Sequence, residues 1–451
     1  MRYSKRIEIR EKYDVVVCGG GFSGFAAAYS AARENLSVVL IEKNGALGGV
    51  GTNGLVNHLL GERCYENGEV KTCVGGLFSQ IESELIKMDG ATDVKDIDLE
   101  LPPQGWLASL GIGLVFDNEK MKLLLEKMLV QVGVKILYMT DVIDVFKGNK
   151  KLKGVLVHNK SGLYGIEAKY FVDATGDADI CKMAGLKTRK GDEDGGMSAA
   201  SLEMHLENVD FDELYEYMRS TKDIRFKALI AELKEKGVWN FPYEIFISVM
   251  LTKKDTFMIN TIRQVGIDGT SAESISNGII DGRRENFEIF EIARKYFPGF
   301  KNAMVRAIAP TIGIRETHRI LGEYTLSIED LISAKDFDDG IALSGYGWDM
   351  PNPKNPSYQP FHGVKRKSKI TQIPYGCLVP QGINNVITVG RCVSVEREVL
   401  GPVRVMGACI AMGEAAGIAT ALALNEDTSY NKVNTTELRK KIVANGGLVD
   451  R

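Results

Sequence analysis

The start of the chain alternates between apolar runs and a helical repeat. Tyr13–Cys18 and Leu36–Ile41 are short, mostly apolar runs, which are typical of strands buried on both faces of a parallel sheet. Between them, a cluster of glycines precedes the alanine-rich segment Phe22–Arg33, whose composition favours a helix. The three segments predict one βαβ unit.

Helical and strand patterns alternate over the next part of the chain. Leu77–Ile86 and Lys120–Val132 predict helices, and the stretch LELPPQGW between them predicts irregular structure. From Val134 to Val172 the pattern changes to short runs with turn residues between them: VKILYM, DVIDVFK, LKGVLVHN, LYGIEA and KYFVDA. This meander predicts an antiparallel crossover sheet inserted in the first domain.

The texture changes again between about residues 190 and 369. Helical patterns become longer, apolar runs become fewer, and the loop WDMPNPKNPSYQPFHG holds four of the 12 prolines. A buried strand at Asn385–Val389 and a long helix at Pro402–Leu424 then return to the first pattern. We expect an α/β protein: residues 1–190 and 370–451 form a Rossmann-like nucleotide-binding domain, and residues 191–369 form an inserted α+β cap or substrate domain.

The glycines between the first strand and the first helix satisfy the pattern G-x-G-x-x-G. Gly19 permits the tight turn, Gly21 lets backbone approach a pyrophosphate, and Gly24 allows close helix–strand packing. Phe22 and Ser23 begin the helix, whose free N–H groups attract phosphate. The motif predicts a bound dinucleotide.

The second strand ends at an acid, and a second glycine-rich segment follows. Glu42 lies 18 residues beyond Gly24, where an acid accepts hydrogen bonds from a ribose. A flavin cofactor needs backbone along its pyrophosphate towards the isoalloxazine, and a nicotinamide cofactor does not. The segment EKNGALGGVGTNGLV therefore favours FAD. Its predicted contacts are Lys43, Gly48, Gly49 and Thr52.

Two later stretches favour the same cofactor. The first is FVDATGDADI, in which small residues follow a predicted buried strand. The second is NNVITVGRCVSV, in which a predicted strand ends at Gly390 and Arg391. A helix starting near Pro402, a favoured first-turn residue, would direct its dipole and Arg404 at the negative charge of a reduced flavin. The further predicted cofactor contacts are Val142, Ala174, Thr175, Gly176, Asp177, Gly390, Arg391 and Val405.

Four stretches carry a family resemblance: GGGFSGFAAA…EKNGALGG, KYFVDATGDADI, PTIGIRETHRILGEYTL and GRCVSVEREVLGPVRVMGACIAMGEAAG. Together they resemble the FAD-dependent oxidoreductase family of the glutathione-reductase-like superfamily, within its fumarate-reductase-like branch. The similarity extends, with gaps, from about Tyr13 to Leu424. It implies a Rossmann-like FAD/NAD(P)-binding domain and FAD. Because the glycine-rich loop up to Thr52 holds no histidine, we expect the FAD to be noncovalent.

The candidate catalytic residues are Arg404, His318 and Arg315. The resemblance places Arg404 where relatives hold a substrate carboxylate, and the alternative is a contact with the cofactor only. His318 has a side chain suited to general acid–base chemistry, and the alternative is a structural histidine. Arg315 either clamps a carboxylate or pairs with Glu316 or Glu323.

Other residues extend this set of candidates. His58, His362 and Tyr375 are candidates for the pocket, whereas His158 and His205 are expected at surface or strand positions. Cys64 and Cys73 have the wrong spacing for the dithiol of disulfide reductases in this superfamily. Relatives often carry an Asp-Ile-His run where this chain has Trp348–Asp349–Met350, so a role for that histidine is not carried over.

Composition limits the partners. A net charge of −3 gives no basic surplus for nucleic acid, and seven scattered cysteines form no C-x-x-C pair for a metal. The N-terminus has no apolar signal segment, and Glu414 interrupts the apolar stretch Val405–Leu424, which predicts a buried helix. We expect a cytoplasmic protein with no membrane span and no metal.

These observations predict a reaction type. The leading hypothesis is hydride transfer between FAD and a small organic substrate: dehydrogenation of a C–H or CH–OH centre, or reduction of an activated double bond. The alternative is an electron-relay subunit of a multi-protein redox complex. The direction, the electron donor or acceptor and the oligomeric state are left open.

Overall fold

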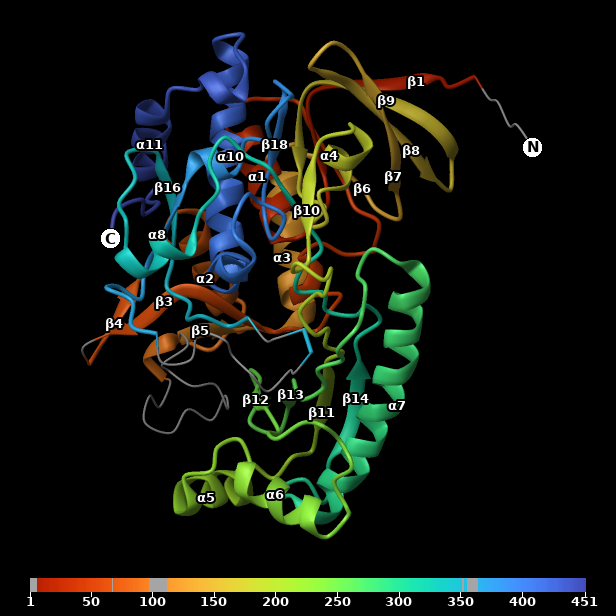
Figure 1. Ribbon diagram of the computed structural model, residues 1–451, viewed down its shortest axis with the longest axis vertical. Helices are drawn as coiled ribbons and strands as arrows, with labels where there is room; N and C mark the ends of the chain where they lie inside the picture. The colour runs from red at the N-terminus through yellow and green to blue at the C-terminus, as the bar shows by residue number, and fades with distance from the viewer. Residues whose placement is uncertain (1–5, 67, 97–111, 351–352, 355–363) are drawn as a thin grey trace.

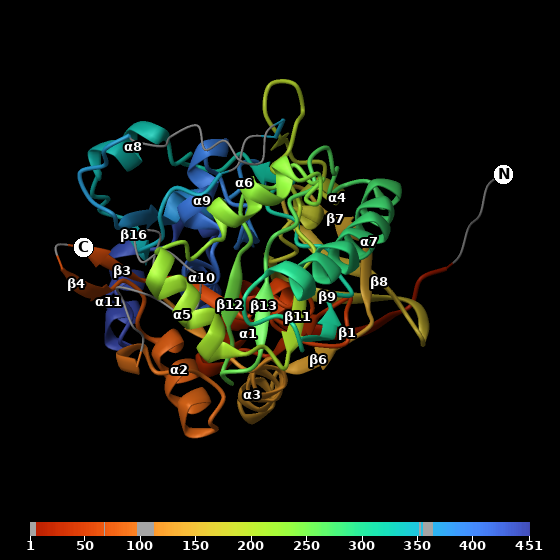
Figure 2. The same ribbon diagram turned by 90° about the horizontal axis from the view of Figure 1, so that it is seen from below.

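The structure is a computed structural model that describes residues 6–66, 68–96, 112–350, 353–354 and 364–451. In Figure 1 the larger part of the molecule holds the main sheet, and a smaller part lies below it. Figure 2, viewed from below, shows this smaller part over the middle of the molecule.

The main sheet has seven strands, with β18 added to β9 beside the path β6-β2-β1-β9-β8-β7. Their bounds are β1 (Ile9–Cys18), β2 (Val38–Ile41), β6 (Lys135–Leu137), β7 (Asp141–Lys147), β8 (Leu152–Asn159), β9 (Gly162–Asp173) and β18 (Val386–Thr388). β1 runs parallel to β2 and β9, and helix α1 (Phe22–Arg33) connects β1 to β2. The predicted βαβ unit and the mixed α/β fold class are confirmed.

The crossover region differs from the prediction in how it joins the main sheet. β7, β8 and β9 do form an antiparallel meander. However, LYGIEA and KYFVDA form one continuous strand, β9, because no turn residue separates them. Its first half pairs with β8 and its last three residues pair with β18, so β9 belongs to both arrangements. Within the run VKILYM, only Lys135–Leu137 form a strand, β6, which is parallel to β2.

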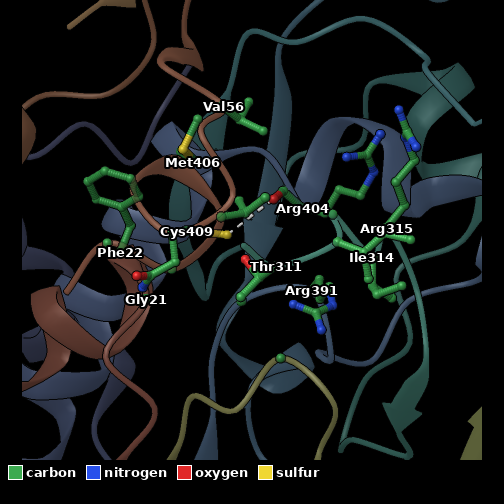
Figure 3. A pocket seen from close by; sticks show the side chains of 18 of the residues that line it. Gly21, Phe22, Val56, Thr311, Ile314, Arg315, Arg391, Arg404, Met406 and Cys409 are labelled. Carbon is green, nitrogen blue, oxygen red and sulfur yellow. Dashed lines mark hydrogen bonds between the residues drawn. The ribbon is translucent and has the colours of Figure 1, made fainter. Parts of the chain in front are cut away.

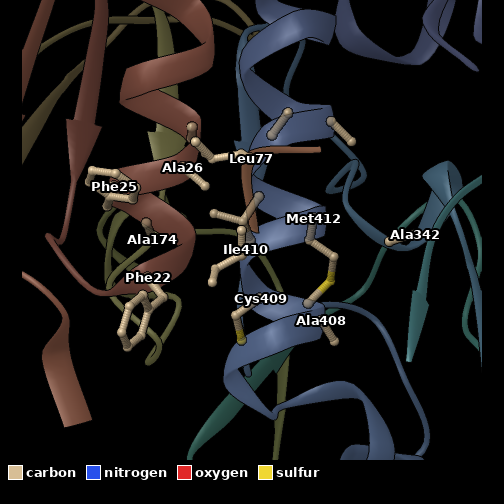
Figure 4. Packing of buried hydrophobic residues seen from close by; sticks show 14 of the residues in the cluster. Phe22, Phe25, Ala26, Leu77, Ala174, Ala342, Ala408, Cys409, Ile410 and Met412 are labelled. Atoms are coloured by element: carbon tan, nitrogen blue, oxygen red, sulfur yellow. The ribbon is translucent and has the colours of Figure 1, made fainter. Parts of the chain in front are cut away.

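Helix α10 (Met406–Asn425) packs against α1 at the centre of the core (Figure 4). A Cβ added at Gly413 would lie 2.2 Å from the Ser23 carbonyl oxygen, so only glycine permits this approach. Among the described helices, α10 alone is long and apolar enough to cross a membrane, and 83% of its most apolar window is buried in the protein. It therefore packs as a core helix.

The predicted start of this helix was wrong. A short helix, α9 (Leu400–Val403), contains Pro402, and the chain then changes direction before α10 begins at Met406. The break falls at Val405, whose ψ of 153° is extended rather than helical. Arg404 therefore lies in the junction between two helices rather than in the first turn of one.

The middle of the chain forms an antiparallel sheet with helices beside it (Figure 1). Its strands are β11 (Met204–Glu207), β12 (Ser248–Met250), β13 (Phe257–Ile259) and β14 (Met304–Ile308), and its helices are α5 (Phe211–Thr221), α6 (Lys227–Glu235) and α7 (Ala272–Tyr296). We call this region the cap. Its separate apolar core runs from Met204 to Ala303, whereas Leu326 and Ile341 pack into the main core. The division at residues 191–369 stays a prediction.

The remaining elements surround the main sheet. The helices are α2 (Leu77–Lys87), α3 (Asn118–Gln131), α4 (Asp179–Met183), α8 (Ile328–Ser333) and α11 (Thr435–Ala444), and the strands are β3 (His58–Glu66), β4 (Glu69–Thr72), β5 (Ile112–Val115), β10 (Thr188–Lys190), β15 (His318–Ile320), β16 (Gly340–Ser344) and β17 (Thr371–Pro374). α3 starts earlier than predicted because Asp117 caps it, accepting from the backbone N–H of Lys120. The stretch LELPPQGW lies outside the described residues.

Candidate functional site

A cavity of about 910 Å³ lies between the carboxyl ends of the main-sheet strands, the start of α10 and the cap. Figure 3 shows Gly21 and Phe22 on one side of it and Arg315 and Arg404 on the other. Most of the predicted cofactor contacts line this cavity: Gly19, Gly21, Phe22, Ser23, Glu42, Lys43, Gly48, Gly49, Val142, Ala174, Thr175, Gly176, Asp177, Gly390, Arg391 and Val405.

The glycine-rich turn between β1 and α1 has a separate role for each glycine. Gly19 has a positive φ of 104°, and a Cβ there would lie 2.4 Å from the Ala174 carbonyl oxygen. A Cβ at Gly24 would lie 1.8 Å from the Gly19 carbonyl oxygen, so Gly24 fixes the packing and does not line the cavity. A Cβ at Gly21 would meet nothing within 4 Å. The backbone at Gly21 is thus open to a ligand.

Glu42 lines the cavity but uses its carboxylate to hold the loops. It accepts from the backbone N–H of Gly20 at 2.7 Å and from the backbone and side-chain nitrogens of Asn44 at 2.7 and 2.8 Å. The sequence predicted a ribose contact for this acid. The structure adds a second task, because the carboxylate ties the first glycine-rich turn to the segment after β2.

The second glycine-rich segment lies against the first. The N–H of Gly48 donates to the Gly20 carbonyl at 2.8 Å, which brings Gly49 beside Gly21. Thr52 does not line the cavity: its hydroxyl donates to the Leu47 carbonyl inside this segment. Thr52 therefore stabilises the conformation of this loop and does not face a ligand in the cavity.

An ion pair between Arg391 and Asp177 lines the end of the cavity that holds the two glycine-rich segments. Arg391 donates to Asp177 at 2.6 Å, and the hydroxyl of Thr317 donates to the same carboxylate at 2.5 Å. Burial alone would raise the pKa of Asp177, but Arg391 holds it below its ordinary value. Asp177 is thus an ionised acceptor at neutral pH, with Lys43 also nearby.

The start of α10 faces the opposite part of the cavity. Met406 and Cys409, both in its first turn, line the cavity (Figure 3). The first N–H groups of a helix carry about half a positive charge, which favours a negative group there. In the junction before α10, Arg404 donates to the backbone and side-chain oxygens of Asp349 at 3.2 and 3.3 Å.

Charged side chains gather where the cap meets this junction. We use the term arginine chamber for the cavity-lining residues Arg225, Glu203, Arg263, Arg315, Asp349 and Arg404. Burial would raise the pKa of Asp349, but Arg404, then Arg315 and Arg263, hold it below its ordinary value. The hydroxyl of Tyr346 also donates to this carboxylate at 3.2 Å.

Two of the three predicted catalytic residues, Arg315 and Arg404, reach the cavity, and His318 does not. His318 lies on β15, and its Nδ1 is 3.0 Å from the Thr188 hydroxyl on β10. Strand pairing thus accounts for its position, and a catalytic role for His318 stays a prediction that the cavity lining does not support.

The other candidates divide in the same way. His58 lines the cavity, but Tyr375 is buried elsewhere and donates to the Tyr430 carbonyl at 3.0 Å. His158 is exposed on β8, and His205 is buried on β11. The Cys64 and Cys73 sulfur atoms lie 3.8 Å apart, away from the cavity lining. His362 lies outside the described residues.

Most residues of the arginine chamber were not predicted from the sequence. Arg225, Glu203 and Arg263 lie in cap segments without a motif, and no spacing relates them. One signal was present for Asp349, because it falls where relatives carry their Asp-Ile-His run. The side chains of the arginine chamber lie far apart in the sequence and come together only in the folded protein.

The end of the cavity with two glycine-rich loops fits a dinucleotide. It offers open backbone at Gly21, a helix N-terminus at Phe22 and an ionised acid at Asp177. The volume of about 910 Å³ is near the upper end for small-molecule sites.

Part of the chain is similar in sequence to two proteins that are named as reductases. It is 27% identical over 187 residues to digeranylgeranylglycerophospholipid reductase of Thermoplasma acidophilum, a match that covers 40% of this chain and 43% of that protein. It is 26% identical over 188 residues to digeranylgeranylglycerophospholipid reductase 1 of Methanococcoides burtonii, covering 40% and 42%. The chain thus matches these relatives over less than half of their length.

Two further comparisons cover nearly the whole chain. The solved structure of the flavin-dependent monooxygenase PieE, in complex with FAD and substrate, superposes with a TM-score of 0.50 at 10% identity, covering 93% of this chain and 59% of that one. This likeness shows the fold. The model of the family described as FAD dependent oxidoreductase matches residues 14–442. The chain therefore belongs to the FAD-dependent oxidoreductase family, and its cofactor is FAD.

Proposed function

We propose that this oxidoreductase transfers hydride between noncovalently bound FAD and a small organic substrate held in the arginine chamber. The observation that carries the proposal is one continuous cavity with two kinds of lining. At one end, glycine backbone and a helix N-terminus fit a dinucleotide. At the other, convergent side chains from the cap and the α9–α10 junction suit a smaller polar molecule.

The residues that would hold FAD are those around the two glycine-rich loops. Gly21, Gly48 and Gly49 offer backbone to the pyrophosphate, and Asp177 offers an ionised acceptor. When bound, FAD supplies the hydride chemistry, and the protein supplies orientation and electrostatics. Burial raises the pKa of the cavity-lining Cys409 thiol to about 12, so this cysteine is a poor nucleophile for a covalent link.

Arg404 and Arg315 are the proposed substrate contacts. Both guanidinium groups are held by protein oxygens: Arg404 by Asp349, and Arg315 by the Ala199 carbonyl and, at 2.9 Å, by the Ser201 hydroxyl. Fixed donors orient a substrate without losing side-chain entropy on binding. The relatives named as reductases favour reduction over dehydrogenation. A cytoplasmic location and the absence of nucleic-acid partners stay predictions.

The test is the visible absorbance of the bound flavin under anaerobic conditions, before and after addition of NADH or NADPH. Rapid bleaching would support a reductase that accepts hydride from a nicotinamide. If only dithionite bleaches the band, organic donors should be tried next. Bleaching by one of them supports the dehydrogenation direction, whereas a flavin that no organic donor or acceptor changes would contradict the proposal. Acid precipitation should release the flavin into solution if it is noncovalent.

A further inference from the structure

Two cysteines meet beside the ribbon formed by β3 and β4, away from the cavity lining. Cys64 on β3 lies opposite Lys71 of β4, and Cys73 follows two residues after Lys71. Side chains two residues apart point to the same face of a strand, so both thiols lie on one face. The Cys73 thiol donates to the Cys64 sulfur at 3.8 Å. The two sulfur atoms must approach each other by less than about 2 Å to form a disulfide.

The two thiols differ in their electrostatics. The hydrogen bond from Cys73 lowers the pKa of Cys64, and Lys369 and Lys71 act in the same direction, against burial and Glu66. The same hydrogen bond, together with burial, raises the pKa of Cys73. Cys64 is therefore the member that ionises, and Cys73 is the member that keeps its proton. The thiolate is the reactive form of a cysteine, so Cys64 is the nucleophile of the pair.

A buried arginine adds positive charge to this cluster. Arg366 donates through Nη2 to the Thr371 hydroxyl at 2.7 Å, whereas its buried Nε atom has no hydrogen-bond partner among the described residues. Burial, followed by Arg451, lowers the pKa of Arg366 to about 10, and Cys64 acts in the opposite direction. A buried cation is costly unless an anion lies near it. A thiolate at Cys64 would supply that anion.

The remaining cysteines have the opposite character. Burial raises the pKa of Cys18, Cys181, Cys377, Cys392 and Cys409. These neutral thiols behave as small apolar side chains. The structure describes all seven cysteines of the chain, and Cys64 is the one whose pKa is lowered. An oxidant that reacts with thiolates should therefore select Cys64.

The surroundings of the pair limit the size of such an oxidant. Cys64 is 1% exposed and Cys73 is fully buried, and both pack against Leu343 and Ile370. In contrast, β4 is exposed along its whole length and lies at the edge of its three-stranded sheet. A short edge strand can open locally without unfolding the core. Such an opening would admit a small molecule more readily than a bulky one.

We propose that Cys64 and Cys73 form a site of reversible oxidation by hydrogen peroxide, in which Cys64 is oxidised first and Cys73 closes a disulfide. The Cys64 thiolate attacks one oxygen of the peroxide, the O–O bond breaks, and the leaving hydroxide takes up a proton to become water. Cys64 is then a sulfenic acid. The Cys73 sulfur attacks it, the S–O bond breaks, and hydroxide leaves with the Cys73 proton as a second water. Two thiols and one peroxide thus give one disulfide and two waters.

This modification site is independent of the proposed function. Neither sulfur lines the cavity, and no step of the oxidation uses the flavin. Failure of the anaerobic absorbance test would therefore leave the thiol pair untouched. Failure of the thiol pair to oxidise would equally leave hydride transfer untouched.

Treatment of the FAD-loaded protein with hydrogen peroxide tests the proposal. Thiols are counted after denaturation, and disulfides are located by mass spectrometry of peptides. Two of the seven thiols should be lost, as one Cys64–Cys73 disulfide that dithiothreitol reverses. Cys64 should react at least about tenfold faster than any cysteine outside the pair. Met139, which is 67% exposed, serves as an internal reference, because peroxide converts methionine to its sulfoxide. If Met139 is oxidised before the disulfide forms, or if other cysteines pair instead, the proposal is overturned.

Three variants separate the roles of the two cysteines. Cys73→Ser keeps a donor for Cys64 but cannot form the disulfide, so a sulfenic acid should accumulate at Cys64 and be trapped by dimedone. Cys64→Ser should lose no thiol under the same treatment. Cys409→Ser, which removes the cysteine that lines the cavity, should form the disulfide as the parent does. Loss of thiols from Cys64→Ser at the parent rate would overturn the assignment of Cys64.

Two further conditions test the size of the oxidant and the role of the fold. Glutathione disulfide, a bulky oxidant, should form the disulfide at least about tenfold more slowly than peroxide. An equal rate would overturn peroxide as the oxidant. In urea, the preference for Cys64 over the cysteines outside the pair should disappear, because the fold creates it. A preference that survives unfolding would contradict the role of the charged cluster. The melting temperatures of the variants are compared first, and if a variant does not fold, the peptide analysis of the parent protein decides the question.

Discussion

The two ends of the cavity are built from different parts of the chain. At the FAD end, the shape comes from backbone, and Gly19, Gly21 and Gly24 set how close the strands, the helix and a ligand approach. At the cap end, the shape comes from long charged side chains such as Arg263 and Arg315, whose backbones lie far apart in the sequence. One end is specified by the absence of side chains and the other by their charge.

This difference predicts how each end responds to substitution. At Gly19 and Gly24 of the FAD end, backbone contacts leave no room, so a single added methyl group at either position acts on folding itself. Charged side chains in the chamber face open cavity, so their removal changes binding and catalysis more than packing. Substitutions at the two ends should therefore separate loss of stability from loss of function.

The largest effect is expected for Gly24→Ala. The new Cβ would lie 1.8 Å from the Gly19 carbonyl oxygen, so α1 must shift away from β1. Alanine favours a helix over glycine by about 1 kcal/mol, but the clash outweighs this gain, and we expect a net loss of about 3 kcal/mol or more. Urea unfolding of the apoprotein measures it. Gly21→Ala, where the Cβ meets nothing within 4 Å, is the matched control. Equal stability of the two variants would contradict this account of Gly24.

The same contrast explains how much could be predicted from sequence. The FAD end follows local rules, since a strand, a glycine turn and a helix lie within one short segment from Tyr13 to Arg33. The fold class followed from the same pattern. The arginine chamber could not be predicted, because Arg225, Arg263 and Asp349 are brought together by the cap sheet and the α9–α10 junction rather than by spacing.

Two differences between the expectation and the structure have the same origin. The start of α10 was placed near Pro402, a residue that suits any first turn, and only the tertiary structure decides that α9 ends before Arg404. His318 was chosen for its side-chain chemistry, yet its place on β15 depends on pairing with β10, a strand far away in sequence. Local sequence signals predicted the backbone conformation of short segments well. They did not predict which side chains, distant in the sequence, lie close together in the fold.

Arg404→Ala should give the next largest effect, on turnover. Removal of a preorganised cationic donor at the proposed substrate site should lower the rate of flavin reduction or reoxidation by about 100-fold. FAD content should change by less than about twofold, because the glycine-rich loops are untouched. Stopped-flow absorbance and the ratio of flavin to protein absorbance measure the two quantities. A fall in FAD content with the rate preserved would make Arg404 a cofactor residue, and the two ends of the cavity would then not be functionally separate.

Gly21→Ala should weaken FAD without destabilising the apoprotein. Its Cβ would project into the open space that backbone N–H groups share with a pyrophosphate. We expect the dissociation constant of FAD to rise by about 30-fold, equivalent to about 2 kcal/mol, while the unfolding free energy of the apoprotein changes by less than about 0.5 kcal/mol. Quenching of FAD fluorescence on titration with apoprotein gives the constant. An unchanged constant would mean that no ligand approaches the backbone here.

Glu42→Ala should have a smaller effect of the same kind. The carboxylate accepts from Gly20 and Asn44, so its loss frees the two loops from each other as well as removing a ribose acceptor. FAD should bind about tenfold more weakly. Glu42→Gln keeps one acceptor oxygen and should fall between the parent protein and Glu42→Ala in the same titration. If both variants retain FAD as the parent does, the ribose lies elsewhere.

The smallest effect on catalysis is expected for His318→Ala, which tests whether the boundary of the site is drawn correctly. Burial, followed by Lys182, lowers the pKa of His318, and its Nδ1 is engaged with Thr188, so the ring serves the pairing of β10 with β15. Loss of that hydrogen bond should cost about 1 kcal/mol of stability. Turnover should change by less than about twofold. Its pH profile should not shift either, whereas loss of a general acid–base residue would remove one limb of that profile.

His318→Gln, which can still form a hydrogen bond to Thr188, should recover stability. A rate lowered by more than about tenfold in both variants, with FAD content unchanged, would place His318 in the reaction and extend the site beyond the cavity lining.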